Sequence, residues 1–165
     1  MTLPHPIMPH IPQLRRYARA LLRNNAAADD LVQDTLERAL RKFSLWQPGT
    51  NLRAWLFSVM HNLYVNQVRA YRDYVSYDDS MEVSVMGCQE SKVELWDLTK
   101  ALQALPPEQR EVLLLVGLEG MRYEEVAQTL GVPIGTVMSR LSRARERLYG
   151  LLEGHKSKPS QKVAT

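Results

Sequence analysis

The sequence has very little cysteine and no long hydrophobic run. Cys88 is the single cysteine among 165 residues, so an internal disulfide is impossible, a usage typical of proteins from reducing compartments. The longest apolar run, Val112 to Val116, is far too short to cross a bilayer. The N-terminal segment has neither a basic start nor a continuous apolar stretch, so it does not form a secretory signal. These absences predict a soluble cytoplasmic protein without membrane insertion.

Side chains that could hold a metal or perform catalysis are also scarce. The candidates are scattered along the chain without paired ligand spacing, at His5, His10, His61, Cys88 and His155. No glycine-rich phosphate loop and no nucleophile motif is present. Since an enzyme needs reactive side chains in mutual geometry, we predict no enzymatic activity, no cofactor, no metal site and no small-molecule substrate.

A large excess of charge of one sign is missing as well. The formal net charge is +3 and the isoelectric point is near 9.1. Nucleic-acid affinity scales with the number of phosphates neutralised, so this small excess does not predict strong DNA binding by the free chain. If the protein binds DNA, its basic residues must be clustered or a partner must help.

The apolar residues that are present predict an all-α fold. They make up 45% of the chain, which is enough for a packed core, but only two of them are phenylalanines. A core of Leu, Val, Ala and Met suits helices. Apolar residues recur at helical spacing in residues 31–43 and again from Leu52, where Thr50 or Asn51 can cap the helix. No strand-like alternation of any length occurs.

A change in composition near Asp73 divides the chain into two small helical domains. Residues 73–95 hold six acids and one base and predict a flexible acidic linker. Beyond it, Pro106 and Pro107 fit a helix start and Gly120 fits a helix end. The predicted organisation is a helical domain at 1–72, the linker at 73–95, a second helical domain at 96–155 and a disordered tail at 156–165.

The second domain has the pattern of a helix-turn-helix. Residues 123–130 predict a short helix, and Gly131 can adopt the left-handed conformation that lets the chain turn sharply. Pro133 and Gly135 precede another helix, and two helices joined by a short glycine-containing turn form this motif. The second helix carries an apolar stripe, which consists of Val137, Leu141, Ala144 and Leu148.

That second helix also carries a cluster of arginines. They are Arg140, Arg143, Arg145 and Arg147, and only Glu146 opposes them. A recognition helix needs side chains that reach base edges in the major groove and arginines that contact phosphates beside it. A helical hairpin whose charged face only confers solubility is the other interpretation of this segment. The clustering of the arginines favours DNA binding.

The first domain contains a second candidate surface. Aromatic, amide and basic side chains interleave from Trp55 to Arg72, a pattern that suits unstacked bases. Asn62 and Asn66 lie one helical turn apart with no acidic neighbour on that segment. We interpret three apolar members of the segment as core residues, namely Trp55, Leu56 and Val59.

Taken together, these segments resemble a known family. Bacterial extracytoplasmic-function (ECF, group IV) sigma factors of the sigma-70 family share the order and approximate spacing of DDLVQDTLERALRKF, WLFSVMHNLYVNQVRAYR, an acidic linker and LPPEQREVLLLVGLEGMRYEEVAQTLGVPIGTVMSRLSRARERL. The resemblance covers residues 11–152. It implies an alternative sigma factor that binds core RNA polymerase and directs promoter recognition, melting and transcription initiation of a stress or envelope-type regulon.

The resemblance implies three sets of contact residues. The clamp helices of the largest polymerase subunit would be bound by Asp30, Gln33, Asp34, Glu37 and Arg38. The minus-ten promoter element would be bound by Trp46, Arg53, Phe57, Asn62, Asn66, Arg69 and Arg72. The minus-thirty-five element would be bound by Thr136, Met138, Ser139, Arg140, Ser142, Arg143, Arg145 and Arg147.

In the family, a base of the non-template strand is flipped into a protein pocket, at an unstacking cost of a few kcal/mol. The positions that match base capture are Trp46, Phe57, Asn62 and Asn66. The sequence departs from the family at Met138, where a basic residue is common, and at Ser142, where an aromatic one occurs. Because methionine cannot make the bidentate contact to guanine that arginine makes, no promoter sequence is transferred.

The resemblance also implies partners other than DNA. The acidic linker would be attracted to the positive channels of the polymerase. The flap of the second-largest polymerase subunit would be a further contact. An anti-sigma factor would hold the protein inactive. From the residues alone, ordinary solvation explains the acidic face of residues 30–41 better than polymerase binding does. For the linker, a solvated flexible tether is as good an explanation as attraction to the polymerase channels.

A free-standing helix-turn-helix repressor or response-regulator output protein is the alternative function. It explains the second domain only and leaves residues 30–41 and 55–72 without a role. A repressor binds duplex promoter DNA without polymerase, whereas a sigma factor barely does.

Overall fold

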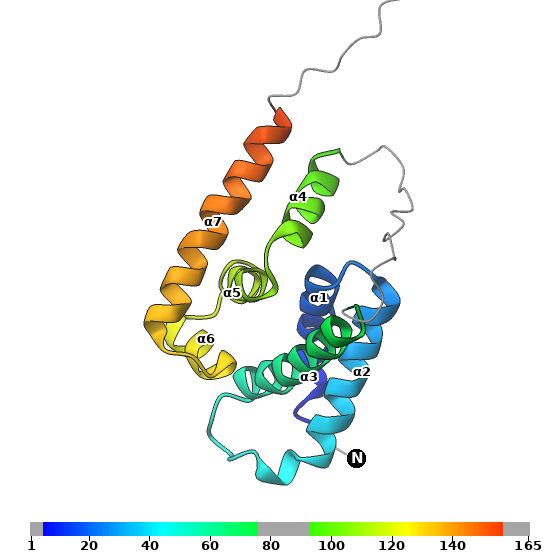
Figure 1. The fold of residues 1–165 in the computed structure, drawn as a ribbon. Coiled ribbons are helices and arrows are strands. Elements are labelled where there is room, and N and C mark those ends of the chain that lie inside the picture. Colours follow the sequence, from blue (N-terminus) through cyan, green and yellow to red (C-terminus); the bar gives the residue numbers. More distant parts are fainter. Residues whose placement is uncertain (1–4, 76–92, 157–165) are drawn as a thin grey trace, which may run out of the picture.

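The computed structural model describes residues 5–75 and 93–156, which form a set of helices (Figure 1). In chain order these are η1 (Met8–His10), α1 (Ile11–Leu21), α2 (Asn25–Arg41), η2 (Phe43–Leu45), α3 (Leu52–Val75), α4 (Val93–Ala104), α5 (Pro107–Gly117), α6 (Tyr123–Leu130) and α7 (Ile134–Lys156). The described ranges contain no β-strand, and the predicted all-α fold is confirmed.

Asparagine side chains cap two of the long helices. Asn24 Oδ1 accepts hydrogen bonds from the amides of Ala26 and Ala27 at 2.9 and 3.2 Å at the start of α2. Asn51 Oδ1 accepts from the Ala54 amide at 3.1 Å at the start of α3, where the sequence predicted a cap. Both side chains satisfy amides that lack a partner within their own helix.

Two predicted helix boundaries are wrong by less than a turn. α5 ends at Gly117 rather than Gly120, whose φ of +64° places it in the following loop. At this end the Leu114 carbonyl accepts hydrogen bonds from the amides of both Leu118 and Glu119, and the regular helical bonding stops there. α7 begins at Ile134, so Gly135 lies in its first turn and does not precede it.

Helices α1, α2 and α3 form the first helical unit. The rings of Tyr17 and Phe57 meet edge to face between α1 and α3, with centroids 5.1 Å apart. Around this pair the fully buried side chains are Leu14, Leu21, Leu31, Leu56 and Met60. Each such side chain stabilises the unit by about 1.5–3 kcal/mol relative to exposure, which makes α3 a firmly held element.

Helices α4 to α7 form the second unit. The buried apolar side chains of this unit include Ala101 of α4 and Val112, Leu115, Val126, Val137, Leu141 and Ala144 of α5 to α7. Arg110 of α5 is buried too, and its guanidinium donates to the carbonyls of Leu102, Gln103 and Leu105, each at 2.8 Å. These bonds satisfy the C-terminal carbonyls of α4 and fix the angle between α4 and α5.

The two units pack against each other, an arrangement that the sequence did not predict. α3 lies against α6 and α1 lies against α5 (Figure 1). Buried apolar residues from both units belong to one continuous hydrophobic cluster. Arg110 also crosses the boundary, because its Nη1 donates to the Leu21 carbonyl of α1 at 3.2 Å.

Both helices that flank the predicted linker extend into it. α3 continues to Val75 and α4 begins at Val93, so the proposed boundaries after residues 72 and 95 fall inside helices. The rest of the predicted linker, residues 76–92, and the predicted tail from residue 157 lie outside the described residues. Their flexibility and disorder stay predictions.

Candidate nucleic-acid and polymerase interface

α6 and α7 form the predicted helix-turn-helix. Gly131 follows α6 in the left-handed conformation, with φ +66° and ψ 36°, which a residue with a side chain adopts only at a steric cost. The two helices bury a shared apolar face, made of Val126, Leu130, Val137, Leu141 and Ala144. The predicted turn glycine and the predicted apolar stripe are therefore confirmed, with Leu148 half-buried at its end.

The opposite face of α7 is open to solvent. The exposed members of the predicted minus-thirty-five set are Met138, Ser139, Ser142, Arg143, Arg145 and Arg147. Thr136 and Arg140 are half-buried, and the Thr136 carbonyl accepts a hydrogen bond from the Ser139 hydroxyl at 3.1 Å. The solvent-exposed side of α7 thus presents three guanidinium groups and two hydroxyls, spread around the helix, which can contact phosphates and base edges.

α3 exposes part of the predicted minus-ten set. Asn62, Asn66 and Arg69 lie on successive turns of its outer face and are all exposed. The Arg72 side chain lies outside the described residues, although its backbone continues α3. The outer face of α3 is therefore a strip of amide and guanidinium groups.

The predicted aromatic members of the minus-ten set behave differently from one another. Trp46 is half-buried with its ring centroid 5.5 Å from that of Phe43, and its buried Nε1 has no hydrogen-bond partner among the described residues. Phe57 is only 2% exposed and packs on Tyr17, so no base can stack on it in this conformation. The packing gives Phe57 a core role in place of the predicted base contact.

The outer face of α2 carries the predicted polymerase contacts. All five are exposed, namely Asp30, Gln33, Asp34, Glu37 and Arg38. Three of them line a groove of about 270 Å³, whose walls are Asp34, Glu37, Arg38, Arg41, Lys42 and Leu63. Leu40, expected on the buried side of this helix, is 55% exposed and adds an apolar group to the same outer face.

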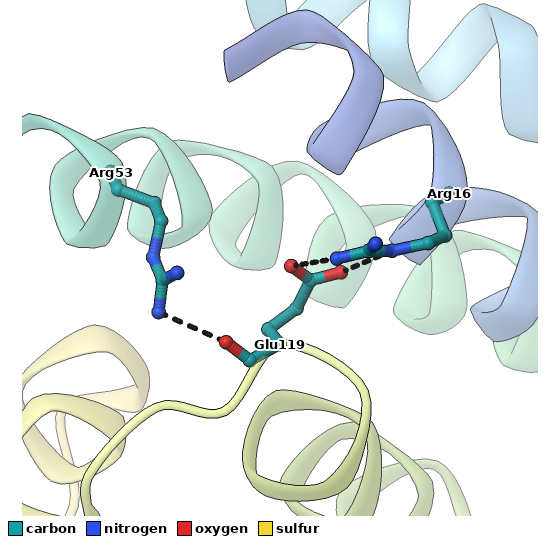
Figure 2. Close-up of polar contacts among 3 residues, drawn as sticks. All are labelled: Arg16, Arg53 and Glu119. Carbon is teal, nitrogen blue, oxygen red and sulfur yellow. Dashed lines mark hydrogen bonds and ion pairs between the residues drawn. The ribbon is translucent and has the colours of Figure 1, made fainter.

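Arg53 makes a hydrogen bond within the protein. It is half-buried, and its Nη2 donates to the Glu119 carbonyl at 3.1 Å (Figure 2). The Glu119 side chain is completely buried and accepts two bonds from the guanidinium of Arg16, at 3.3 Å from Nε and 2.9 Å from Nη2. The loop after α5 is thereby tied to both α1 and α3.

A second buried pair joins α3 to α5. His61 Nδ1 lies 2.7 Å from Glu111 Oε1, and both side chains are buried or nearly so. Burial raises the pKa of Glu111 above its usual 4.5, an effect that the hydrogen bond and charge of His61 partly offset. Burial, together with the nearby Glu111 charge, also raises the pKa of Tyr17 well above its usual value of 10.0 and keeps the phenol neutral.

Comparison with known proteins assigns both units. Residues 7–61 match the family described as the Sigma2 domain of PhyR, and residues 95–148 match Sigma-70, region 4. The chain is 41% identical over 149 residues to the ECF RNA polymerase sigma factor EcfG of Rhodopseudomonas palustris (strain TIE-1), covering 88% of this chain and 82% of that protein. The chain belongs to the ECF sigma factors.

Solved structures agree with this assignment of the sigma factor. The sigma factor RpoE, solved in complex with the anti-sigma factor NepR from Bartonella quintana, is 39% identical with a TM-score of 0.76, covering 89% of this chain and 94% of that chain. The anti-anti-sigma factor PhyR, solved with NepR from the same organism, is 19% identical with a TM-score of 0.62, covering 87% of this chain and 48% of that chain, which shows the fold alone. The predicted family is confirmed.

One residue from each predicted promoter-contact set of the sigma factor lines a common cavity. A cavity of about 310 Å³ lies between the units, with Arg69 of α3 and Arg140 of α7 both in its wall. His61 and Glu111 line it as well. One predicted minus-ten residue and one predicted minus-thirty-five residue therefore face the same space.

Sequence reasoning missed the buried carboxylates at this boundary. Glu111 and Glu119 are both buried. In the sequence, the local sign of this burial is that each acid has apolar neighbours, in QREVLLL and LLLVGLEG. His61 is one of four scattered histidines, and its sequence neighbours do not indicate a buried partner. Leu45, next to Trp46, is 71% exposed. Its neighbours in the sequence do not distinguish an exposed leucine from a buried one.

Two further features of the described residues bear on the family. No described helix is both long and apolar enough to cross a membrane. Among the residues whose positions are described, no three His, Cys, Asp or Glu side chains gather in a group that could hold a metal ion.

Proposed function

We propose that this ECF sigma factor binds core RNA polymerase through α2, the minus-ten element through α3 and the minus-thirty-five element through α7. The observation that carries the proposal is the presence of two exposed surfaces of DNA-binding character in one chain, one on α3 and one on α7. The α3 surface presents amides and a guanidinium group, and the α7 surface presents hydroxyls and guanidinium groups. The protein acts by binding, without a catalytic step, in the cytoplasm where core polymerase works.

The polymerase contact is assigned to the outer face of α2. Its members are Asp30, Gln33, Asp34, Glu37 and Arg38, and their exposure leaves them available to a partner. The groove beside Asp34 and the exposed Leu40 supply shape and an apolar contact, while the exposed charges would speed and orient association. The clamp helices of the largest subunit are the proposed partner, and the second unit would contact the flap of the second-largest subunit.

The minus-ten contact is assigned to Trp46, Asn62, Asn66 and Arg69, with Arg53 and Arg72 as phosphate contacts by family resemblance. An amide both donates and accepts, so two amides one turn apart can read the edges of unstacked bases. The orphaned Nε1 of Trp46 would gain a hydrogen-bond partner when a base arrives, which favours binding because a buried unpaired donor is costly.

The minus-thirty-five contact is assigned to α7 and comprises Thr136, Met138, Ser139, Arg140, Ser142, Arg143, Arg145 and Arg147. Met138, Ser142 and Arg145 line a shallow groove of about 210 Å³ next to Tyr123. Met138 offers an apolar contact, which fits a thymine methyl better than a guanine edge. The base preference at this position should therefore differ from that of relatives with a basic residue there.

An anti-sigma factor is part of the proposal. RpoE, 39% identical to this chain over most of both lengths, was solved in complex with the anti-sigma factor NepR. That similarity supports an inhibitor of the same kind for this sigma factor. Such an inhibitor would compete with polymerase or hold the two units together.

A protein that imitates a sigma factor without initiating transcription is the second candidate function. It is favoured by one observation, the match of residues 7–61 to the family named after PhyR, which is described as an anti-anti-sigma factor. A mimic needs only the surface that an anti-sigma factor binds. It leaves the exposed arginines of α7 without a function, and a free-standing repressor leaves α2 without one.

In vitro transcription tests these candidates. Purified protein is added to bacterial core polymerase on a pool of genomic promoter fragments, with the variant Arg143→Ala/Arg147→Ala as a matched control. A sigma factor gives specific start sites that the control loses. A mimic gives no start sites and instead binds an anti-sigma factor, which relieves the inhibition of a sigma factor. A repressor shifts duplex DNA without polymerase.

A further inference from the structure

Polar contacts cross the boundary between the two units in both directions. The first unit contributes guanidinium and imidazole groups to carboxyl and carbonyl oxygens of the second, through Arg16 to Glu119, Arg53 to Glu119 and His61 to Glu111. The second unit donates in return to the end of α1, where Gln103 Nε2 reaches the carbonyls of Ala20 and Leu21 at 3.4 Å and Arg110 reaches Leu21. The closed arrangement is therefore built from specific bonds as well as apolar contact.

Glu119 takes part in more of these contacts than any other residue, with three hydrogen bonds. Its carboxylate is completely buried and is held by Arg16, whose own side chain is 54% exposed, while its carbonyl holds Arg53 (Figure 2). A carboxylate buried without its partner is strongly destabilising. The closed arrangement thus depends on the Arg16 ion pair, because without it Glu119 would favour a state in which water reaches it.

The closed arrangement cannot engage both promoter elements at once. The minus-ten and minus-thirty-five elements lie about 25 base pairs apart, or about 85 Å along the duplex. In the structure α3 and α6 are in contact, and Arg69 and Arg140 share one cavity. Arg53, a proposed phosphate contact, is already bound to Glu119. The units must separate before the promoter is bound.

We propose that Glu119, with Arg16 and Arg53, is an intramolecular latch that closes the free sigma factor on itself and must break before promoter binding. The latch is distinct from an anti-sigma factor, because all of its parts belong to this chain. Its conflict with promoter binding rests on the proposed function, whereas the latch itself does not.

Energy transfer between two dyes measures the latch without polymerase or DNA. The dyes are attached to cysteines at the exposed positions Ser44 and Gln128, one in each unit, after Cys88→Ser removes the native cysteine. The variants are Glu119→Arg, Arg16→Glu and the charge swap that combines them. Glu124→Arg, a reversal at an exposed acid of α6, is the matched control. Far-UV circular dichroism checks that each variant keeps its helices.

We expect efficient transfer in the wild type, a fall of about twofold in each single variant as the open population grows, and recovery in the charge swap. The control should match the wild type. Unchanged transfer in both single variants, or a charge swap that fails to recover, overturns the latch. Since the readout is a distance in the free chain, the latch can fail while transcription succeeds, and the proposed function can fail while the latch stands.

Discussion

Replacing Arg110 by alanine should destabilise the chain by about 3–5 kcal/mol. The residue is 8% exposed, and its guanidinium donates to the carbonyls of Leu102, Gln103 and Leu105 at 2.8 Å and of Leu21 at 3.2 Å. Among the described residues no carboxylate lies within ion-pair distance of it, so the charge is balanced by the negative ends of α1 and α4. Alanine leaves a cavity and several carbonyls without a donor.

The magnitude follows from these bonds. A hydrogen bond to a charged group contributes about 1.5–3 kcal/mol, and a carbonyl left buried without a donor costs about 1–3 kcal/mol. Water can reach some of the freed carbonyls, because Arg110 lies near the boundary of the two units, so the sum falls well below four full bonds. The estimate of about 3–5 kcal/mol takes roughly half of the gross loss.

Urea unfolding followed by far-UV circular dichroism measures the change. Arg110→Lys should lie between wild type and alanine, since an ammonium cannot span carbonyls from two helix ends. Arg122→Ala is the matched control, because its side chain is 82% exposed and its pair with Glu125 should contribute no more than about 1 kcal/mol. A loss below about 1 kcal/mol for Arg110→Ala would refute the assigned role of the carbonyl bonds.

Three further changes test the promoter surfaces and the buried pair. Asn62→Ala should impair promoter opening, seen by permanganate footprinting, more than polymerase binding; equal losses would contradict base capture. Arg143→Ala should weaken minus-thirty-five recognition by about 1–3 kcal/mol, and an unchanged footprint there would remove Arg143 from the contact set. Because the folded pKa of Glu111 is raised above 4.5, the folded chain binds more protons than the unfolded chain as pH rises from that value, and the free energy of unfolding falls across this window. Glu111→Gln should remove that fall in urea unfolding from about pH 4 to about pH 8, and a variant that parallels the wild type would count against a raised pKa of Glu111.

Features that depend on neighbours in the sequence could be predicted. The start of α3 follows from the Asn51 cap, the turn between α6 and α7 from Gly131, and the buried face of α7 from residues spaced at helical intervals. Each signal is complete within about one helical turn, so no tertiary information is needed. The exposed arginine face of α7 was found for the same reason.

Features that depend on the other unit could not be predicted. Arg16 and Glu119 are separated by 103 residues, and no local pattern relates them. Phe57 shows the same limit: its aromatic ring suits either a base or a core, and only the position of Tyr17 decides for the core. The family resemblance assigns Phe57 and Arg53 to the promoter surface because a resemblance compares sequence positions. Whether a side chain is buried or bonded in the closed chain depends on packing, which a sequence position does not show.

The structure gives a further reason, besides the small net charge, for the free chain to bind DNA weakly. Three of its cations, Arg16, Arg53 and Arg110, already interact with oxygens at or near the boundary of the two units and are not free to contact DNA in the closed chain. Fewer free cations mean fewer phosphates neutralised and weak binding by the free chain. A closed state lowers the apparent affinity further, by the fraction of molecules that is open. Polymerase would reverse both effects, because it holds the units apart and places each surface beside its promoter element at high effective concentration. Promoter binding is then conditional on polymerase, through the same contacts that stabilise the free fold.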